Sequence, residues 1–183
     1  MYLDNMTSNC FWITGLSASG KTTISHKLQK LLIENNQKVI LLDGDVLRRI
    51  FKHDKYDVNS RLTYGHIYAD LCKFLISQNL NVIISVGGLF HELHEWNRKN
   101  ISGYIEIFLD VPFNELEKRD PKGLYKNYKT GSVKNLNGVD IKPQLPINPN
   151  IHLKWQNGEK ENKTFSKLIY NLKENYTDLE YLL

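Results

Sequence analysis

The sequence has few cysteines and no long apolar run, and each lack excludes a class of protein. Only two of the 183 residues are cysteine, too few for a disulfide framework, so Cys10 and Cys72 are expected as buried packing residues in a reducing compartment. No apolar run approaches the roughly 20 residues of a membrane span. Residues 1–9 lack the basic and apolar regions of a signal peptide. We therefore expect a cytoplasmic protein without a membrane partner.

The excess of positive charge is local. The net charge is +4, yet residues 118–142 hold seven Lys or Arg and two Asp, which leaves 17 basic and 18 acidic residues elsewhere. A basic surplus confined to one glycine-containing segment favours a local phosphate clamp over a nucleic-acid-binding face. A basic loop that is merely solvated is the alternative.

One stretch, residues 11–23 (FWITGLSASGKTT), indicates nucleotide binding. Gly15 to Thr22 fits G-x-x-x-x-G-K-[ST], a phosphate-binding loop between a strand and a helix. Its glycines let backbone N–H groups turn toward phosphate oxygens, and the following helix adds its positive dipole end. A chance glycine-rich turn is the alternative. The residues expected to bind ATP here are Gly15, Ser17, Ala18, Ser19, Gly20, Lys21, Thr22 and Thr23, with Lys21 on the β- and γ-phosphates and Thr22 on Mg²⁺.

Hydrophobic periodicity predicts strands alternating with helices. Strands are expected up to residue 15 and at 37–43, 81–86, 104–110 and 151–155, and helices at 21–36, 46–52, 60–79, 90–100, 112–119 and 163–176. The continuous apolar run within 37–43 is typical of a strand covered on both faces. The pattern predicts a single three-layer α/β domain over residues 1–183, with a mostly parallel sheet and right-handed crossovers.

Residues 120–150 interrupt this alternation. Glycine, proline, asparagine and lysine dominate there, and neither helical nor strand periodicity is present. Such a segment in a compact domain is usually a lid, a binding loop or disordered. We expect a lid over about residues 119–150.

Two carboxylates follow the second predicted strand. Asp43 and Asp45 lie where open parallel sheets bind ligands, so both are functional candidates. Their alternative role is to cap the next helix. The phosphate-binding loop is shared by ATPases, GTPases and kinases. The guanine-selecting signature of GTPases is absent, which favours ATP.

Four segments together resemble the adenylylsulfate (APS) kinases: residues 15–23, 42–48 (LDGDVLR), 119–125 (RDPKGLY) and 138–140 (GVD). The resemblance covers about residues 11–153, and the R-D-x-K-G-L-Y element is its most specific part. It implies a P-loop kinase fold and, with Mg²⁺, transfer of the ATP γ-phosphate to the ribose 3′-hydroxyl of a small nucleotide. It also suggests a homodimer.

The resemblance and the chemistry of phosphoryl transfer assign the carboxylates and lysines. Asp45 is the candidate that accepts or orients the hydroxyl proton, and Asp43 holds Mg²⁺-bound water, although these two roles could be exchanged. Lys122 matches the lid lysine near the transferred group, and Lys21 and Lys122 join Asp45 as the catalytic candidates.

The remaining site residues match family positions. Arg48 and Arg61 match arginines around the anionic end of the acceptor, and Arg119 would lie near the ATP base or phosphates unless it is a solvent-exposed structural residue. Tyr56 and Phe90 match aromatic positions of the acceptor pocket, and each could equally be ordinary core.

The departures from the family pattern lie on the acceptor side. Leu136 replaces a base-stacking Phe, Val46 replaces an Asn, and Tyr64 and Gly88 stand where the family has other polar residues. Some relatives associated with capsule synthesis phosphorylate cytidine diphosphoramidate instead. The acceptor is therefore either adenylyl sulfate, slightly favoured by family frequency, or cytidine diphosphoramidate. A different class, a non-catalytic ATP-binding regulatory module, is the competing hypothesis.

Two histidines, His91 and His94, lie one helical turn apart, but H-E-x-H is not H-E-x-x-H and has no evident third ligand. A partly exposed helix face is preferred there over a zinc site.

Overall fold

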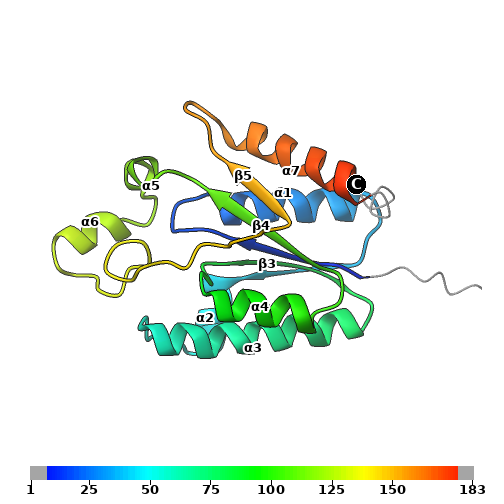
Figure 1. Cartoon of the computed structure of the whole chain (residues 1–183), viewed down its shortest axis with the longest axis horizontal. Coiled ribbons are helices and arrows are strands. Elements are labelled where there is room, and N and C mark those ends of the chain that lie inside the picture. The colour runs from blue at the N-terminus through cyan, green and yellow to red at the C-terminus, as the bar shows by residue number, and fades with distance from the viewer. Residues whose placement is uncertain (1–7, 177–183) are drawn as a thin grey trace, which may run out of the picture.

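The computed structural model describes residues 8–176 as an α/β fold around a five-stranded sheet (Figure 1). The strands are β1 (Cys10–Thr14), β2 (Val39–Asp43), β3 (Asn81–Val86), β4 (Tyr104–Asp110) and β5 (Ile151–Lys154). Their order is β2-β3-β1-β4-β5, and every neighbouring pair is parallel. The predicted parallel α/β fold is confirmed.

Helices cover both faces of the sheet. They are α1 (Lys21–Glu34), α2 (Gly44–Ile50), α3 (Val58–Ser77), α4 (His91–Asn100), α5 (Phe113–Arg119), α6 (Leu124–Lys129) and α7 (Glu161–Asn175). Figure 1 shows α1 and α7 on one face and α2, α3 and α4 on the other, which makes three layers. Among the described residues, no helix is both long enough and apolar enough to cross a membrane.

Alternate side chains of the central strands supply the two halves of the core. Phe11 and Ile13 of β1 pack with α1 and α7, whereas Cys10 and Trp12 pack with α3 and α4. Cys72 of α3 lies in the second half, and both cysteines are fully buried, as predicted. This two-sided burial of β1 fixes the strand that leads into the phosphate-binding loop.

The prediction that both faces of the second strand are covered was wrong in degree. β2 is an edge strand, paired only with β3 within the described chain. Its residues are partly buried at best, and Ile40 is 37% exposed. The continuous apolar run thus indicated correctly that helices approach both faces of the strand. It gave no indication that the outer edge of the strand is unpaired.

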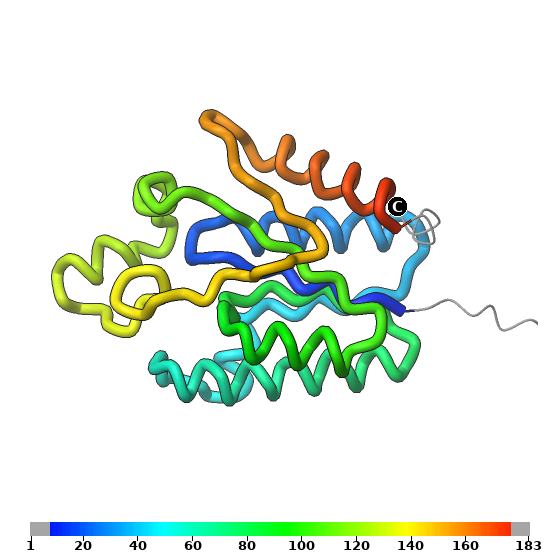
Figure 2. The backbone as a smooth tube through the Cα atoms, viewed as in Figure 1, coloured from blue at the N-terminus to red at the C-terminus, as the bar shows by residue number. Residues whose placement is uncertain are grey.

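Most of the 119–150 segment lies beyond the carboxyl ends of the strands, and its last residues run back along the sheet to β5 (Figures 1 and 2). It contains α6, a helix that periodicity did not predict because it has only six residues. Tyr125 of α6 is buried, and its hydroxyl donates to Ser17 O at 3.0 Å. Together with Leu136, it packs in a small apolar cluster that includes Leu16 of the phosphate-binding loop. The segment is thus attached to the loop by apolar contacts.

Candidate active site

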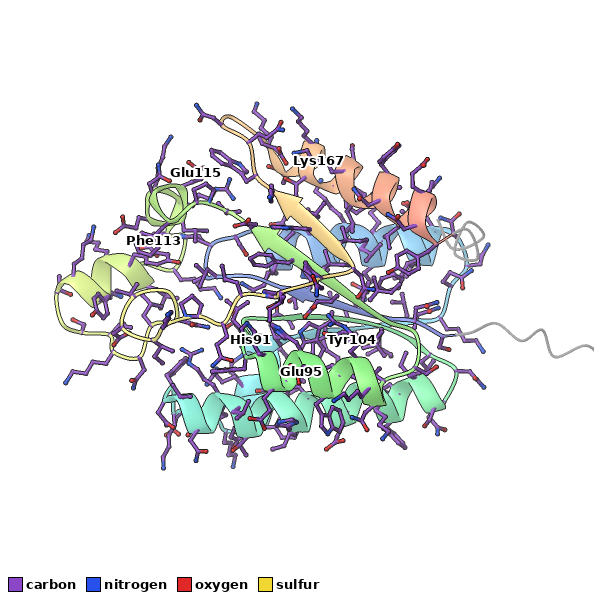
Figure 3. The ribbon with its side chains drawn as sticks, viewed as in Figure 1. His91, Glu95, Tyr104, Phe113, Glu115 and Lys167 are labelled. Atoms are coloured by element: carbon purple, nitrogen blue, oxygen red, sulfur yellow. The ribbon has the colours of Figure 1, made fainter. Side chains whose placement is uncertain are left out.

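A cavity of about 1480 Å³ opens where the carboxyl ends of β1, β2 and β3 meet. We call its two walls the loop side and the arginine side. The loop side comprises residues 15–24 with Glu115, Arg119 and residues 159–161, and the arginine side comprises Arg48, His53, Tyr56, Arg61, Leu136 and Asn137. Figure 3 places Glu115 on α5, at the end of the molecule where the 119–150 segment projects.

The phosphate-binding loop needs its first glycine. Gly15 has φ of +153°, and a Cβ there would lie 2.7 Å from Leu109 O, so the close approach of β4 excludes any side chain. Gly20, with φ of 96°, precedes α1, which begins at Lys21. The hydroxyl of Ser19 is buried and has no hydrogen-bond partner in the described chain. A phosphate oxygen in the loop would supply that partner.

Lys21 is folded back onto this loop. Its Nζ donates to Gly15 O at 3.0 Å and to Leu16 O at 2.7 Å. Burial, and then the positive charge of Lys122, lower the pKa of Lys21 to about 8, against the opposing effects of Asp45 and Asp43. A bound polyphosphate would stabilise the ammonium and raise this pKa.

Asp43 is both a helix cap and a metal-ligand candidate. Its Oδ1 accepts from Asp45 N at 2.9 Å, and its Oδ2 accepts from Thr22 Oγ1 at 3.1 Å and Ser85 Oγ at 3.2 Å. Burial alone would raise the pKa of Asp43, but these hydrogen bonds outweigh it and hold the pKa below its usual value. The capping alternative is therefore correct for Asp43, which stays ionised beside Thr22.

Thr22 and Asp43 fit a magnesium ion. Mg²⁺ usually binds one or two protein oxygens and completes its shell with water and substrate phosphates. The Thr22–Asp43 pair supplies such oxygens directly beside the loop, and in the described chain no group of three or more His, Cys, Asp or Glu residues competes for a metal.

Lys122 reaches from the 119–150 segment to the end of β2. Its Nζ forms an ion pair with Asp45 Oδ2, and the two side chains are 54% and 63% exposed. The Asp45 side chain is therefore mostly exposed, and among the described residues it is Asp43, not Asp45, that accepts the capping hydrogen bonds of α2. Lys21, Asp45 and Lys122 all line the cavity, and the charges of Asp45 and Lys122 both act on Lys21.

Two arginines and a tyrosine form the opposite wall. The guanidinium carbons of Arg48 and Arg61 lie 4.2 and 5.4 Å from the centre of the Tyr56 ring. Arg48 Nη1 donates to Lys55 O at 3.0 Å, and Arg61 Nη2 donates to Asn135 O at 2.8 Å. Burial, and then Arg48, lower the pKa of Arg61. Two cations held this close form a site for an anion.

The structure separates the other predicted residues. Leu136 lines the cavity, whereas Phe90 is 5% exposed, packs in the α3–α4 core and lies off the cavity wall, so the core alternative describes its position. Arg119 lines the loop side, where its Nε donates to Glu115 Oε1 at 2.9 Å and its guanidinium carbon lies 5.5 Å from the Trp155 ring centre.

The arginine side also contains residues that sequence reasoning missed. His53 stacks on Tyr64 with ring centres 3.6 Å apart, and its Nδ1 lies 3.0 Å from Arg48 Nη1. Burial, and then Arg48, lower the pKa of His53. His53 belongs to no motif. The one sequence signal beside it is Tyr64, which stands where the family has a different residue.

The two histidines of α4 have structural roles. His91 Nε2 lies 2.9 Å from Leu145 O, and Figure 3 shows this residue at the start of α4. The expectation of a partly exposed face was wrong for His94, which is 4% exposed with Nε2 2.6 Å from Gly88 O. Burial lowers the pKa of His94 to about 4. It supports the loop after β3.

Comparisons with known proteins agree on one family. The family model described as adenylylsulphate kinase matches residues 7–154. A cytidine diphosphoramidate kinase of Campylobacter jejuni is 39% identical over 74% of this chain and 79% of its own. An adenylyl-sulfate kinase of Pseudomonas aeruginosa is 36% identical over 76% and 73%. The solved APS kinase CysC of Mycobacterium tuberculosis, in complex with AMPPNP and APS, superimposes with a TM-score of 0.83 at 26% identity, covering 91% of this chain and 98% of that one.

Proposed function

The chain belongs to the adenylylsulphate kinase family, and on that premise we propose that it transfers the γ-phosphate of ATP, with Mg²⁺, to the ribose 3′-hydroxyl of a small nucleotide. The observation that carries the proposal is the convergence of Lys21, Asp45 and Lys122 between a phosphate-binding loop and an arginine pair.

In this proposal each side of the cavity binds one ligand. The polyphosphate of ATP binds on the loop side, where Gly20 precedes α1 and Lys21 begins it, and Thr22 and, through a water molecule, Asp43 would hold Mg²⁺. When bound there, the metal would supply positive charge that neutralises the transferring phosphate. The anionic end of the acceptor binds between Arg48 and Arg61, which brings the ribose hydroxyl to the centre of the cavity.

Asp45 then faces the hydroxyl. Its carboxylate is ion-paired with Lys122, so the acceptor replaces Lys122 as the partner of Asp45, and Lys122 turns to the transferred phosphate. The carboxylate orients the hydroxyl and accepts its proton as the oxygen attacks the γ-phosphorus. Phosphoryl transfer depends mainly on this positioning and charge neutralisation.

The 119–150 segment serves as a lid in this proposal. It already contacts both sides of the cavity, through Tyr125 to Ser17 and through Asn135 to Arg61. Closure over both ligands excludes water and limits wasteful hydrolysis of ATP. A homodimer, which the family resemblance suggests, stays a prediction that sedimentation velocity would check.

Adenylyl sulfate and cytidine diphosphoramidate are the two candidate acceptors. The Pseudomonas and Mycobacterium proteins favour the first by name. The Campylobacter protein favours the second, and so does Leu136, an aliphatic residue at a base-stacking position. Both are nucleotides with a small group on the 5′ phosphate chain, and the same arginine pair would receive either.

The test is an ADP-release assay with each acceptor at saturating MgATP. Turnover that depends on one of the two acceptors is expected. Tight ATP binding by calorimetry, with no acceptor-dependent turnover across a broad nucleotide panel, would instead establish a non-catalytic ATP-binding module.

A further inference from the structure

Besides the Ser19 hydroxyl, three buried polar atoms of residues that line the cavity have no hydrogen-bond partner within residues 8–176. They are Trp12 Nε1, Tyr68 Oη and Asn137 Oδ1, and their residues are 0%, 5% and 7% exposed. Buried polar groups without partners are rare because each costs a lost hydrogen bond to water. Three of them around one cavity indicate that a ligand supplies the partners.

The orientation of the Asn137 carboxamide follows from its one neighbour. Its Nδ2 lies 3.4 Å from Gly87 O. A carbonyl oxygen only accepts hydrogen bonds, so the amide NH₂ must face Gly87 and Oδ1 must face away from it. The free atom is therefore an acceptor.

The backbone around Asn137 is firmly held. Asp140 accepts hydrogen bonds from Asn135 N at 2.7 Å and from Leu136 N at 2.5 Å, and Gly138 N donates to Ile141 O at 2.8 Å. Gly138 has φ of +92°, and a Cβ there would lie 2.8 Å from the Leu16 side chain. The carboxamide is thus positioned before any ligand binds.

Space for a flat ring lies beside Asn137. Gly87 follows β3 without a side chain, and among the described residues only Gly15 O, at 3.7 Å, lies within 4 Å of a Cβ built there, whereas a Cβ at Gly88 would already meet Leu93 at 3.1 Å. Leu136 provides an apolar wall next to this space. An apolar wall and an open floor fit the face and edge of a nucleobase.

We propose that Asn137 reads the base of the acceptor nucleotide, its Oδ1 accepting a hydrogen bond from an exocyclic amino group. Cytosine and adenine both carry that group next to a ring nitrogen, whereas uracil and hypoxanthine carry a carbonyl oxygen there. That oxygen would face Oδ1 with no proton between the two acceptors. The inference rests on the proposed function only in taking the ligand to be a nucleotide.

The test is calorimetry of four nucleotides with the full chain saturated with MgADP, which fills the phosphate-binding loop. The pairs are cytidine against uridine 5′-diphosphate, and adenosine against inosine 5′-monophosphate. In the wild type the amino member of at least one pair should bind about 10- to 100-fold more tightly, the range of one good contact to a base edge. Asn137→Leu should reduce that preference to about twofold or less, because only an apolar surface then faces the base.

Asn97→Leu is the matched control. Asn97 is also buried with an unpartnered Oδ1, but it lies on α4 away from the cavity, so its loss should lower the melting temperature and leave the preference intact. Asn137→Ser, which adds no volume, must lose the preference too and serves if the leucine variant does not fold.

Equal binding within both pairs by the wild type, a preference that survives in Asn137→Leu and Asn137→Ser, or no binding of any of the four nucleotides would each overturn the assignment. Phosphoryl transfer is measured separately. A preference that depends on Asn137, without turnover, would refute the kinase proposal and leave the role of Asn137 standing.

Discussion

The two sides of the cavity are built in different ways. The loop side is dominated by one continuous stretch, residues 15–24, fixed between a buried strand and α1. The arginine side takes its residues from α2, the loop after it, α3 and the 119–150 segment. A continuous motif keeps its geometry as a unit, whereas a wall assembled from four places can change one residue at a time. The difference explains how a family keeps its phosphate donor and exchanges its acceptor.

The largest expected effect is at Asp45, where the two sides meet. Asp45→Asn should lower acceptor-dependent turnover by about 10²- to 10⁴-fold, because a carboxamide does not accept the hydroxyl proton. ATP affinity, measured by calorimetry, should change little. Asp70→Asn, on the exposed face of α3, is the matched control and should leave both values as they are. Unchanged turnover in Asp45→Asn would remove this residue from its proposed role.

Lys122 tests whether the 119–150 segment takes part in the chemistry. Lys122→Met should lower kcat by about 10- to 100-fold, since a charge-assisted contact to the transferred phosphate is lost. The exposed Lys126, in the same segment, provides the control variant Lys126→Met. Equal kinetics of the two variants would mean that the ion pair with Asp45 is only a surface contact.

Arg61 should separate the two sides in a kinetic measurement. Arg61→Lys removes the planar guanidinium and its contact to Asn135 O, so the KM of the acceptor should rise by about tenfold while the KM of ATP stays constant. A parallel rise in both KM values would show that the walls do not act independently.

The pH dependence of ATP binding tests the loop side alone. The pKa of free Lys21 is about 8, and bound phosphate raises it, so binding above pH 8 must take up a proton. The Kd of ATP should therefore rise by about tenfold between pH 7 and pH 9, because at one pH unit above the pKa of the free lysine only about one tenth of the protein carries the charged form that binds. Calorimetry at pH 9 in buffers of different ionisation enthalpy should detect the proton uptake, and Lys21→Met should show none.

The smallest expected effect is at Leu136. Leu136→Phe introduces an aromatic wall and should tighten a purine acceptor by only about fivefold, the low end of the roughly 1–3 kcal/mol that stacking on one aromatic ring contributes. Leu136 is only 6% exposed, so overpacking offsets part of this gain. A change in ATP affinity instead would mean that Leu136 contacts the ATP on the loop side and not the acceptor.

Local patterns were sufficient to predict most of the fold. β3 and β4 begin and end at the predicted residues, because apolar runs bounded by turn residues have only one reading there. α6 was missed because six residues carry no measurable period, and its position depends on the burial of Tyr125. The edge position of β2 depends on the order of the strands in the sheet, which the residues of β2 alone do not determine.

The site divides in the same way. Lys21, Thr22 and Asp43 lie together because one motif and one strand end determine them. Phe90 turned into the core because α4 packs against α3, and the Asn137 side chain donates through Nδ2 to Gly87 O, which is 50 residues away in the sequence. Such positions depend on tertiary contacts and carry no periodic or spacing signal of their own.

The central claim is that the γ-phosphate of ATP reaches a ribose 3′-oxygen. Phosphorus NMR of the product formed from MgATP and the turned-over acceptor tests it most directly. The account predicts a new phosphomonoester signal coupled to the H3′ proton of the ribose, formed by the wild type and lost in Asp45→Asn. A product carrying the phosphate at another position, or only inorganic phosphate and ADP, would contradict it.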